Sequence, residues 1–572
     1  MSLQSFIALF LILFVVGCSH HPQSPLKNPI KKQQQAVAMP DKFAADVAEQ
    51  ILDKGGNAID AAIAAQFSLA VTFPEAGNIG GGGFMVVHYE GKSDFLDYRE
   101  QAPAAAFTDM YINENGEVDP YKSIFGALAS GVPGTVAGMW AAHEKYGSLP
   151  WEDLVAPAIK LAEEGFVVPD KLEAHIIGYI SRLKQNNIEV NFAKYFAHAQ
   201  ANKVFKQPAL AETLKRIQNA GRDGFYKGET ARLISQFMLE HDGLITEADL
   251  AGYEAKWREP IKSTWRGYTL VSAAPPSSGG IAINQWLQMY DLVKDKGIEF
   301  KHNDLLYTHV LSEIGKRVFA DRGEYLGDPD FYTVPSAALL TDDYLAQRAE
   351  EVSLDSISVT EEVKPGLPES EDTTHFSIVD KFGNAVSNTT TINLGFGSGM
   401  VVDGAGFLLN DEMDDFSAKP GVPNFFGAIG GVANEIQPHK RMLSSMTPTI
   451  VLEGNKIKMV TGSPGGTTIL TSVYQSILNA LEFNLPVQKV VDSPRFHHQL
   501  LPKNEIRYHS GFAKDVLAEL EAMGYTTRQS RFGDLHVIIV RDGDLQAASE
   551  SNGRGEARVM RTDWFGKMFN LH

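Results

Sequence analysis

A polar segment that gives way to a β-hairpin is the feature that most limits how this chain can fold. Residues 361–371 contain two prolines, one glycine and several acids, a composition typical of an exposed loop. Apolar and polar residues then partly alternate over residues 375–379, which predicts a strand. A turn at residues 381–384 and a second strand at residues 385–392 complete the hairpin. Thr373 therefore stands where the loop meets the first strand.

Thr373 becomes a candidate nucleophile if the peptide bond after Asp372 is cut. The residue would then carry both a free α-amine and a hydroxyl, and the amine could act as the base for its own hydroxyl. The same residues also fit a purely structural interpretation, because threonine is favoured in strands. The hairpin alone leaves both interpretations open.

The composition of the chain excludes some classes of partner. Its 572 residues are 44% hydrophobic, which suffices for a large core and favours several domains. The 51 basic and 70 acidic residues give a net charge of −19, which argues against binding to nucleic acid or to an anionic membrane surface. The sequence has no His-Glu-x-x-His motif and no set of cysteine and histidine ligands, so we predict neither a metal site nor a cofactor.

The N-terminal residues predict an export signal followed by a tether. Residues 6–16 are almost entirely apolar, a run too short to span a bilayer but typical of a secretory signal. The run ends near Cys18, the single cysteine, in a sequence that resembles a bacterial lipobox, although no Lys or Arg precedes it. We expect a lipoprotein signal at residues 1–17, acylation of Cys18, and a flexible tether at residues 18–36. A plain signal peptide with an incidental cysteine is the alternative.

A pair of glycines follows another predicted strand. Residues 457–460 predict a strand and residues 468–481 a helix, with Gly465 and Gly466 in the turn between them. Backbone N–H groups at the start of a helix stabilise an anion. A bound phosphate and the oxyanion that develops during acyl transfer are both compatible with this arrangement.

Arg99 lies at the end of a predicted strand, residues 95–100. An arginine in this position can hold a carboxylate through two parallel hydrogen bonds. A surface ion pair with Asp97 or Glu100 is the commoner explanation of the same residues. The local sequence does not decide between the two.

Most of the remaining chain has the pattern of helices. Helices are predicted at residues 43–54, 58–71 and 150–164, the last with a kink or restart at Pro157, and over most of residues 170–350. A loop at 419–431 is rich in proline, glycine and phenylalanine. It is too long and too apolar for a plain connector, which favours a lid, and a surface loop without a role is the alternative.

Several long motifs, taken together and in order, resemble those of the γ-glutamyltranspeptidases, or glutathione hydrolases. The likeness extends from about residue 35 to about residue 545, and the number of motifs makes it highly specific. The motifs lie at residues 77–83, 96–100, 131–138, 372–377, 410–416, 438–449, 461–466 and 494–499. Residues 548–554 follow the family pattern Ala-Ser-Asp-Pro-Arg only in part, so we assign them no role. In the lid, Phe426 stands where bacterial relatives often have tyrosine.

The resemblance implies an α/β fold of the N-terminal-nucleophile hydrolase type, a four-layer αββα sandwich built from two chains of one self-cleaved precursor. The bond between Asp372 and Thr373 would be cut, giving a large subunit, residues 37–372, and a small catalytic subunit, residues 373–572, that stay together as a heterodimer. Thr373 would be the nucleophile and its α-amine the base. By the same likeness, Thr391 steadies that nucleophile, and the two glycines described above form the oxyanion hole.

The resemblance also implies how an amino-acid head would be held. Arg99, Ser444 and Ser445 would bind the α-carboxylate of a γ-glutamyl group. Its α-amine would be bound by Asn393, Glu412 and Asp415. A zwitterionic head needs one cationic and one anionic clamp, and the sequence supplies both.

We therefore predict a self-processing γ-glutamyl hydrolase and transferase acting on glutathione and related compounds. It would form a γ-glutamyl-threonine ester and pass the acyl group to water, an amino acid or a peptide. It would lie in the bacterial cell envelope, on the periplasmic or outer-membrane side, held to the membrane by its lipid alone. A glutaryl- or cephalosporin-type acylase is an alternative, against which the anionic residue Asp415 argues. A non-catalytic, lipid-anchored binding protein is another, which an uncut chain would favour.

Overall fold

The computed structural model describes residues 34–119, 121–360, 362–363, 373–417 and 431–561. Three residues singled out above, Cys18, Asp372 and Phe426, lie outside these ranges. The lipid anchor, the bond to be cut and the lid residue therefore stay predictions.

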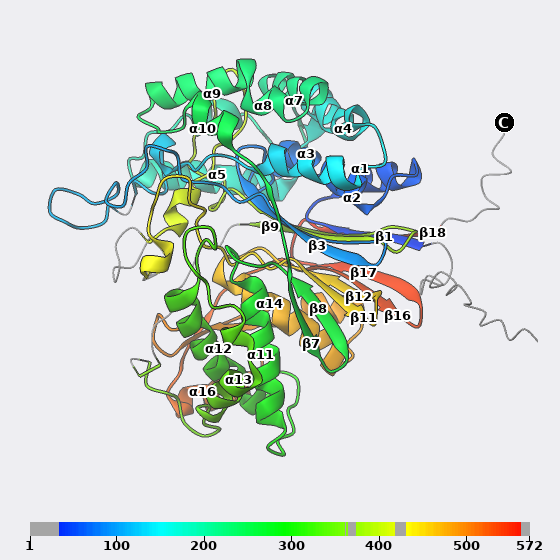
Figure 1. The fold of residues 1–572 in the computed structure, drawn as a ribbon, viewed down its shortest axis with the longest axis vertical. Coiled ribbons are helices and arrows are strands. Elements are labelled where there is room, and N and C mark those ends of the chain that lie inside the picture. The colour runs from blue at the N-terminus through cyan, green and yellow to red at the C-terminus, as the bar shows by residue number, and fades with distance from the viewer. Residues whose placement is uncertain (1–33, 120, 361, 364–372, 418–430, 562–572) are drawn as a thin grey trace, which may run out of the picture.

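Two β-sheets lie face to face between two layers of helices (Figure 1). In the described part of the chain the first sheet has seven strands, in the order β18 (Glu556–Arg561), β1 (Gln34–Met39), β9 (Thr374–Val379), β10 (Ala385–Thr391), β2 (Gly82–Tyr89), β3 (Lys92–Asp97) and β6 (Lys256–Arg258). The second sheet has six there, in the order β17 (Asp544–Ser549), β16 (His536–Arg541), β12 (Lys456–Thr461), β11 (Thr449–Glu453), β8 (Tyr268–Ser272) and β7 (Ile261–Trp265). This arrangement confirms the predicted αββα sandwich.

The helices divide between the two outer layers. The layer on the first sheet contains α1 (Lys42–Asp53), α2 (Ala58–Thr72), α3 (Thr135–Tyr146), α4 (Trp151–Glu164), α5 (Asp170–Gln185), α6 (Phe192–Phe196), α7 (Pro208–Ala220), α8 (Asp223–Tyr226), α9 (Gly228–Glu240) and α10 (Glu247–Gly252). The layer on the second sheet contains α11 (Gly279–Lys294), α12 (Leu305–Tyr325), α13 (Asp342–Glu350), α14 (Thr467–Ile477), α15 (Val487–Asp492) and α16 (Lys514–Met523). Among the helices that the structure describes, none has the length and apolar character needed to cross a bilayer.

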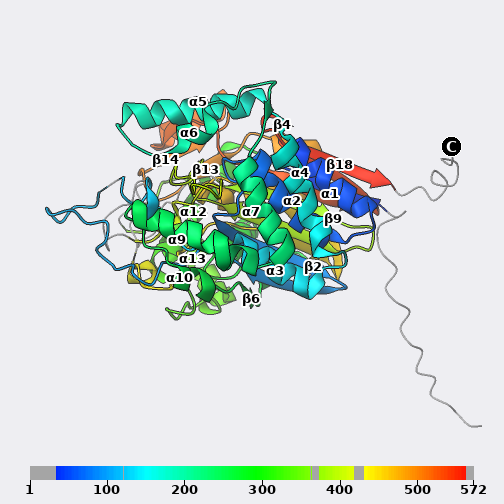
Figure 2. The same cartoon turned by 90° about the horizontal axis from the view of Figure 1, so that it is seen from above.

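Two small sheets lie outside the sandwich. One pairs β4 (Phe166–Val167) with β5 (Val204–Phe205), and the other contains β13 (Phe496–His498), β14 (Glu505–Tyr508) and β15 (Thr526–Gln529). Seen from above, α5 runs along one side of the molecule (Figure 2). It buries Leu172, Ile176, Tyr179 and Leu183, whose spacing of three to four residues places them on one helical face.

The predicted hairpin forms the middle of the first sheet. Strands β9 and β10 are buried along their whole length, between the second sheet and the helices of the first layer. Helix α2, which packs on them, is mostly apolar and every one of its residues is buried, as expected for a core helix. Its first turn is closed by a capping box in which Asn57 and Asp60 each accept a hydrogen bond from the other's backbone N–H.

Hydrogen bonds between side chain and backbone fix the two sheets against each other. Ser377 of β9 donates to the carbonyl of His536 at 2.9 Å, and Ser387 of β10 donates to the carbonyl of Thr461 at 3.0 Å. The Ser387 hydroxyl also accepts from the backbone N–H of Thr449 at 2.9 Å. These buried bonds set the position of the hairpin, and with it the position of Thr373, relative to the second sheet.

Both sheets combine strands that precede Thr373 with strands that follow it. In the first sheet β1 lies between β18 and β9, and β10 pairs with β2. In the second sheet β11 pairs with β8. A cut before Thr373 would therefore leave the two parts of the chain joined by the hydrogen bonds of both sheets.

The structure differs from the sequence predictions at four places. Strand β1 begins at Gln34, so the tether predicted through residue 36 ends earlier and its last residues are buried in the sheet. Helix α4 continues through Pro157 without a restart. Strands β6, β7 and β8 interrupt the region predicted to be helical, and α14 ends at Ile477, where a π-helix (Leu478–Glu482) follows.

Candidate active site

Thr373 directly precedes the first residue of β9, and its side chain is half-buried. Its hydroxyl points toward that of Thr391, at the end of the neighbouring strand β10, with 3.5 Å between the two oxygens. The Thr391 oxygen also accepts a hydrogen bond from the backbone N–H of Asn393 at 2.8 Å. The pairing of β9 with β10 brings the two threonines together.

Gly465 and Gly466 form the turn between β12 and α14. Both have a positive φ, 124° and 56°, a conformation that side chains rarely adopt. A Cβ on Gly465 would lie 2.3 Å from the hydroxyl oxygen of Thr468. Within the described residues their backbone N–H groups have no hydrogen-bond acceptor. The turn thus presents two donors at a helix N-terminus, as an oxyanion hole requires.

A narrow pocket beside Thr373 collects most of the predicted site. It is lined by Arg99, Thr373, Thr391, Asn393, Glu412, Asp415, Ser444, Ser445, Met446, Gly466 and Ile469. Glu412 and Asp415 lie in a single 3₁₀ turn, and Asn393 adopts a left-handed φ of 71° directly after β10. Met446 and Ile469 are the members that sequence reasoning did not single out, since nothing distinguishes a pocket-lining apolar side chain from a core one before the fold is known.

Arg99 is the centre of charge in this pocket. Its side chain is fully buried, and its guanidinium forms ion pairs with Glu412 and Asp415. It also donates to the backbone carbonyls of Met442 at 3.3 Å and Leu443 at 3.2 Å. The alternative of a surface ion pair is wrong in its location, because Arg99 does pair with Glu100 at 3.5 Å but both side chains are fully buried.

The cationic and anionic clamps predicted from the sequence contact each other directly. A zwitterionic ligand can enter between them by exchanging ion pairs, its carboxylate taking Arg99 and its ammonium taking Asp415. The charge balance of the pocket is kept in that exchange, so no unpaired buried charge is created.

The two serines of the pocket differ in their bonding. The Ser444 hydroxyl accepts a hydrogen bond from the backbone N–H of Met446 at 3.2 Å. The Ser445 hydroxyl is buried and has no hydrogen-bond partner among the described residues. A buried polar group without a partner is costly, which makes Ser445 a ready donor or acceptor for a ligand.

Burial perturbs several acids around the pocket. It raises the pKa of Glu100 from its ordinary 4.5 to about 7, with the neighbouring Arg99 opposing the rise. It raises the pKa of Asp414 to about 6, against a hydrogen bond from Ser123. Groups with pKa values shifted in this way are common at functional sites. Within the described residues, no cluster of histidine, cysteine or acidic side chains could hold a metal ion.

A threonine at the start of a central strand, a glycine turn with free N–H groups and an αββα sandwich define the class of N-terminal-nucleophile hydrolases. The sequence model of the Gamma-glutamyltranspeptidase family matches residues 44–560. The chain belongs to that family, and it is an enzyme of the γ-glutamyl hydrolase and transferase type.

Relatives at high identity support this assignment. The chain is 53% identical over 532 residues to a glutathione hydrolase proenzyme of Pseudomonas aeruginosa, covering 92% of this chain and 94% of that protein. It is 44% identical over 540 residues to the glutathione hydrolase proenzyme of Escherichia coli, covering 93% of each.

Solved structures share the fold. Cephalosporin acylase from Bacillus halodurans superposes with a TM-score of 0.80 at 26% identity, covering 96% of this chain and 99% of the other. Gamma-glutamyltranspeptidase from Pseudomonas nitroreducens complexed with L-DON has a TM-score of 0.55 at 52% identity, covering 57% of this chain and 97% of that chain.

The raised pKa of Glu100 predicts a pH dependence of stability. A carboxyl whose folded pKa, about 7, exceeds an unfolded value of 4.5 contributes stability that is complete below pH 4.5 and is lost as the pH rises through 7. The glutamine of Glu100→Gln cannot ionise. Between pH 5 and pH 8 the free energy of unfolding of this variant should therefore fall less than that of the native chain, by on the order of 3 kcal/mol. Urea unfolding at the two pH values measures this.

A matched control is Glu259→Gln, which removes an exposed carboxylate of the same type. It should lose as much stability between the two pH values as the native chain. An equal loss in the native chain and in Glu100→Gln would contradict the assignment of a raised pKa to Glu100.

Proposed function

We propose that this chain cuts itself before Thr373 and then uses the new N-terminal threonine to cleave the γ-glutamyl amide bond of glutathione and related compounds. The observation that carries the proposal is the position of the Thr373 hydroxyl. Together with Gly466 of the glycine turn, Thr373 lines a pocket that contains one cation and two anions. That pocket suits an amino-acid head, and the N–H groups suit the oxyanion of acyl transfer.

The catalytic cycle follows from these positions. The Thr373 oxygen attacks the γ-carbonyl carbon while the α-amine of the same residue takes its proton. The N–H groups of Gly465 and Gly466 bind the developing oxyanion, and the proton passes to the departing amine. The resulting γ-glutamyl ester is then cleaved by water or by the amine of an amino acid or peptide. A free α-amine titrates near pH 7.7–8.0, a useful value for a base at neutral pH.

The substrate head is held by the exchange of ion pairs described above. Arg99, with help from Ser444 and Ser445, takes the α-carboxylate of the γ-glutamyl group. Asp415, Glu412 and Asn393 take its α-ammonium. The fork of Arg99 matches the two oxygens of a carboxylate, which a lysine cannot reproduce.

Self-cleavage uses the same hydroxyl before an α-amine exists. The Thr373 oxygen attacks the carbonyl of Asp372, the peptide nitrogen leaves as the new α-amine, and water hydrolyses the ester. Processing therefore precedes turnover. The two products, residues up to 372 and residues 373–572, stay together as large and small subunits because both sheets contain strands of each.

The chief alternative is an acylase for glutaryl or cephalosporin side chains, and a cephalosporin acylase shares this fold. A glutaryl side chain has no α-ammonium. The buried carboxylates of Glu412 and Asp415 beside Arg99 would then have no ammonium group to bind. Their presence therefore favours the γ-glutamyl substrate.

We also propose an envelope location. Cys18 would carry the lipid, with the protein on the periplasmic or outer-membrane side of the bacterial envelope. The support is the sequence alone, because Cys18 lies outside the described residues. The lid at residues 419–431, which contains Phe426, is likewise proposed from the sequence alone.

Thr373→Ala should give one intact, inactive chain, since no hydroxyl is left to attack Asp372. The native protein should give two fragments on a denaturing gel, the smaller beginning Thr373-Thr374-His375. Thr373→Ser keeps a hydroxyl, so it should process and turn over at reduced rates. Fragments from Thr373→Ala cut at the same bond would mean that an outside protease makes the cut.

Arg99→Lys should lower kcat/KM for γ-glutamyl-4-nitroanilide by about 100-fold. Lysine cannot reproduce the two-point fork with which Arg99 holds the α-carboxylate of the substrate. Asp415→Asn should also lower it, by removing the charge partner of the substrate ammonium. Arg232→Lys, at a half-exposed arginine on α9, is the matched control and should change nothing. Equal rates of the native enzyme on γ-glutamyl and plain glutaryl anilides would support the acylase instead.

Cys18→Ser should release the protein into the soluble fraction of cells. Each buried CH₂ of an acyl chain contributes roughly 0.8 kcal/mol to membrane binding, so several chains hold the native protein firmly. Fractionation and the mass of the mature N-terminal peptide measure this. A native protein that is already soluble, with its signal cut elsewhere, would rule out the anchor.

A further inference from the structure

Helix α12 contains three charged residues, Glu313, Lys316 and Arg317, whose side chains are at most 2% exposed. Lys316 Nζ and Arg317 Nη1 each lie 3.1 Å from an oxygen of the Glu313 carboxylate. None of the three lines the pocket that contains Arg99. Buried charges are costly unless other charges and hydrogen bonds compensate them, so the remaining partners of this α12 cluster indicate what it holds.

The remaining partners of the α12 cluster belong to the chain that leads to the predicted cleavage site. Lys316 donates to the carbonyl of Ser358 at 2.8 Å. Arg317 donates to the hydroxyl of Ser358 at 2.9 Å and to the carbonyl of Glu351 at 2.5 Å. Glu313 accepts from both the backbone N–H and the hydroxyl of Ser358. Ser358 is thus bound through its carbonyl, its hydroxyl and its N–H by the three charged groups.

Apolar packing and one histidine hold the same segment. Val352 and Val363 are buried in the apolar core around the second sheet. The Nε2 atom of His309, also on α12, lies 3.0 Å from the carbonyl of Ser353. The chain between the end of α13 and residue 363 is therefore fixed near both of its described ends.

The α12 cluster also contacts the part of the chain that follows Thr373. Lys316 donates to the side-chain oxygen of Asn504 at 3.1 Å. The hydroxyl of Tyr525 donates to Glu313 at 3.4 Å. Both parts of the chain therefore hold the cluster in place.

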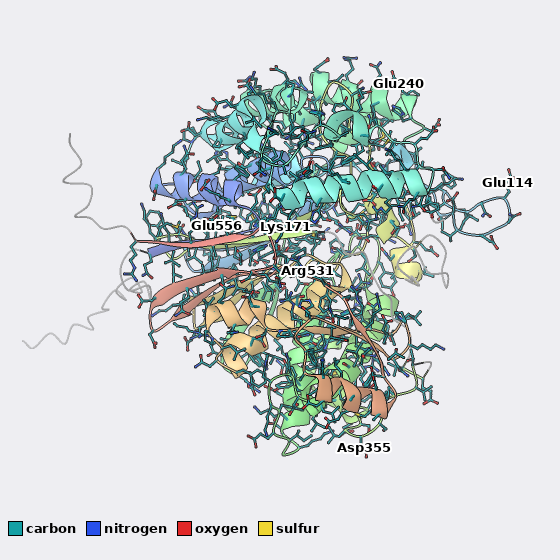
Figure 3. The ribbon with its side chains drawn as sticks, turned by 180° about the vertical axis from the view of Figure 1, so that it is seen from behind. Glu114, Lys171, Glu240, Asp355, Arg531 and Glu556 are labelled. Carbon is teal, nitrogen blue, oxygen red and sulfur yellow. The ribbon has the colours of Figure 1, made fainter. Side chains whose placement is uncertain are left out.

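The segment that the cluster binds lies away from the reacting groups. Figure 3 shows Asp355, in this segment, at the lower end of the molecule and well below Arg531. Arg531 lines a cavity that Thr373 also lines. An effect of the α12 cluster on the reaction therefore has to pass through the chain between Val363 and Thr373.

Two fixed points bound the chain around the bond to be cut. Val363 is packed in the core on one side, and Thr373 is placed by the hairpin of β9 and β10 on the other. Nine residues, 364–372, connect them. Without the α12 cluster the nearest fixed point upstream would be Glu350, the end of α13, and the connection would have 22 residues, 351–372. The entropic cost of bringing a chain into one arrangement rises with the number of free residues.

We propose that the α12 cluster is a positioning device for self-cleavage, which limits the free chain before Thr373 to nine residues and so brings the carbonyl of Asp372 to the Thr373 oxygen more often. In that step the oxygen forms a bond to the carbonyl carbon of Asp372. The bond from this carbon to the nitrogen of Thr373 breaks, and the hydroxyl proton passes to that nitrogen. Water then hydrolyses the ester. The proposal rests on the proposed self-cleavage and names residues that set its rate without touching the reacting atoms.

Lys316→Met removes the ammonium group and keeps an apolar stem of similar length. Release of the segment lengthens the free connection from nine to 22 residues, which should slow the cut by about 4-fold through the entropy of loop closure. The kcat and KM of the cut enzyme for γ-glutamyl-4-nitroanilide should stay as in the native enzyme, because no residue of the cluster lines the pocket. Cell-free synthesis of the full chain with a labelled pulse, followed on a denaturing gel, measures the rate of the cut.

Chain length separates this role from a merely structural one. An insertion of about a dozen glycine and serine residues after Glu369 lengthens the connection itself and should slow the cut by about 4-fold. In that longer chain Lys316→Met should slow it by only about 2-fold more, because the proportional change in length is smaller. An effect of Lys316→Met that is equal in the two backgrounds would overturn the proposal.

Lys160→Met is the matched control, because Lys160 also lies on a helix beside a glutamate but is exposed. It should be cut at the native rate. An equal rate of cutting in the native chain and in Lys316→Met contradicts the positioning role. A fall in turnover as large as the fall in cutting also contradicts it, since it would mean a general loss of structure.

A second variant decides if Lys316→Met does not fold. Ser358→Ala removes only the hydroxyl that Arg317 and Glu313 bind. Slower cutting with unchanged turnover supports the role of the cluster, and an unchanged rate of cutting overturns it. A native chain that is never cut would instead refute the proposed self-cleavage, which keeps the two failures distinct.

Discussion

The burial of the Arg99 guanidinium is the constraint on which the site depends. A charge removed from water has to be compensated by other charges and by hydrogen bonds. The compensation comes from Glu412 and Asp415 and from two backbone carbonyls, all more than three hundred residues further along the chain. The end of β3, the 3₁₀ turn and the segment before β11 are thereby drawn into one pocket. The same arrangement leaves a site that a zwitterion can enter without loss of charge balance.

The position of the nucleophile has a separate origin. Thr373 is placed by the hairpin of β9 and β10, and the hairpin is fixed by buried hydrogen bonds to the second sheet through Ser377 and Ser387. Both sheets contain strands from both parts of the chain, so a cut at Thr373 frees an amine without freeing a domain. Processing can then create the catalytic base while the pocket stays assembled.

Much of the fold and site could be predicted from the sequence because the signals are local. The hairpin, the apolar helix α2 and the glycine turn at 465–466 follow from periodicity and turn chemistry. Strands β6 to β8 could not be found in this way, since they lie within a long region of amphipathic pattern. The direct contact between Arg99 and its acids and the raised pKa of Glu100 depend on burial, which only the folded chain defines.

The central claim is that Thr373, freed at its N-terminus, carries the acyl group. The most direct measurement mixes the purified protein briefly with a γ-glutamyl donor, quenches the mixture in acid and maps the adduct by mass spectrometry. The account predicts one γ-glutamyl group, linked as an ester, on a peptide that begins with Thr373. An adduct on another residue, or on a peptide that still runs through the bond between Asp372 and Thr373, would contradict it.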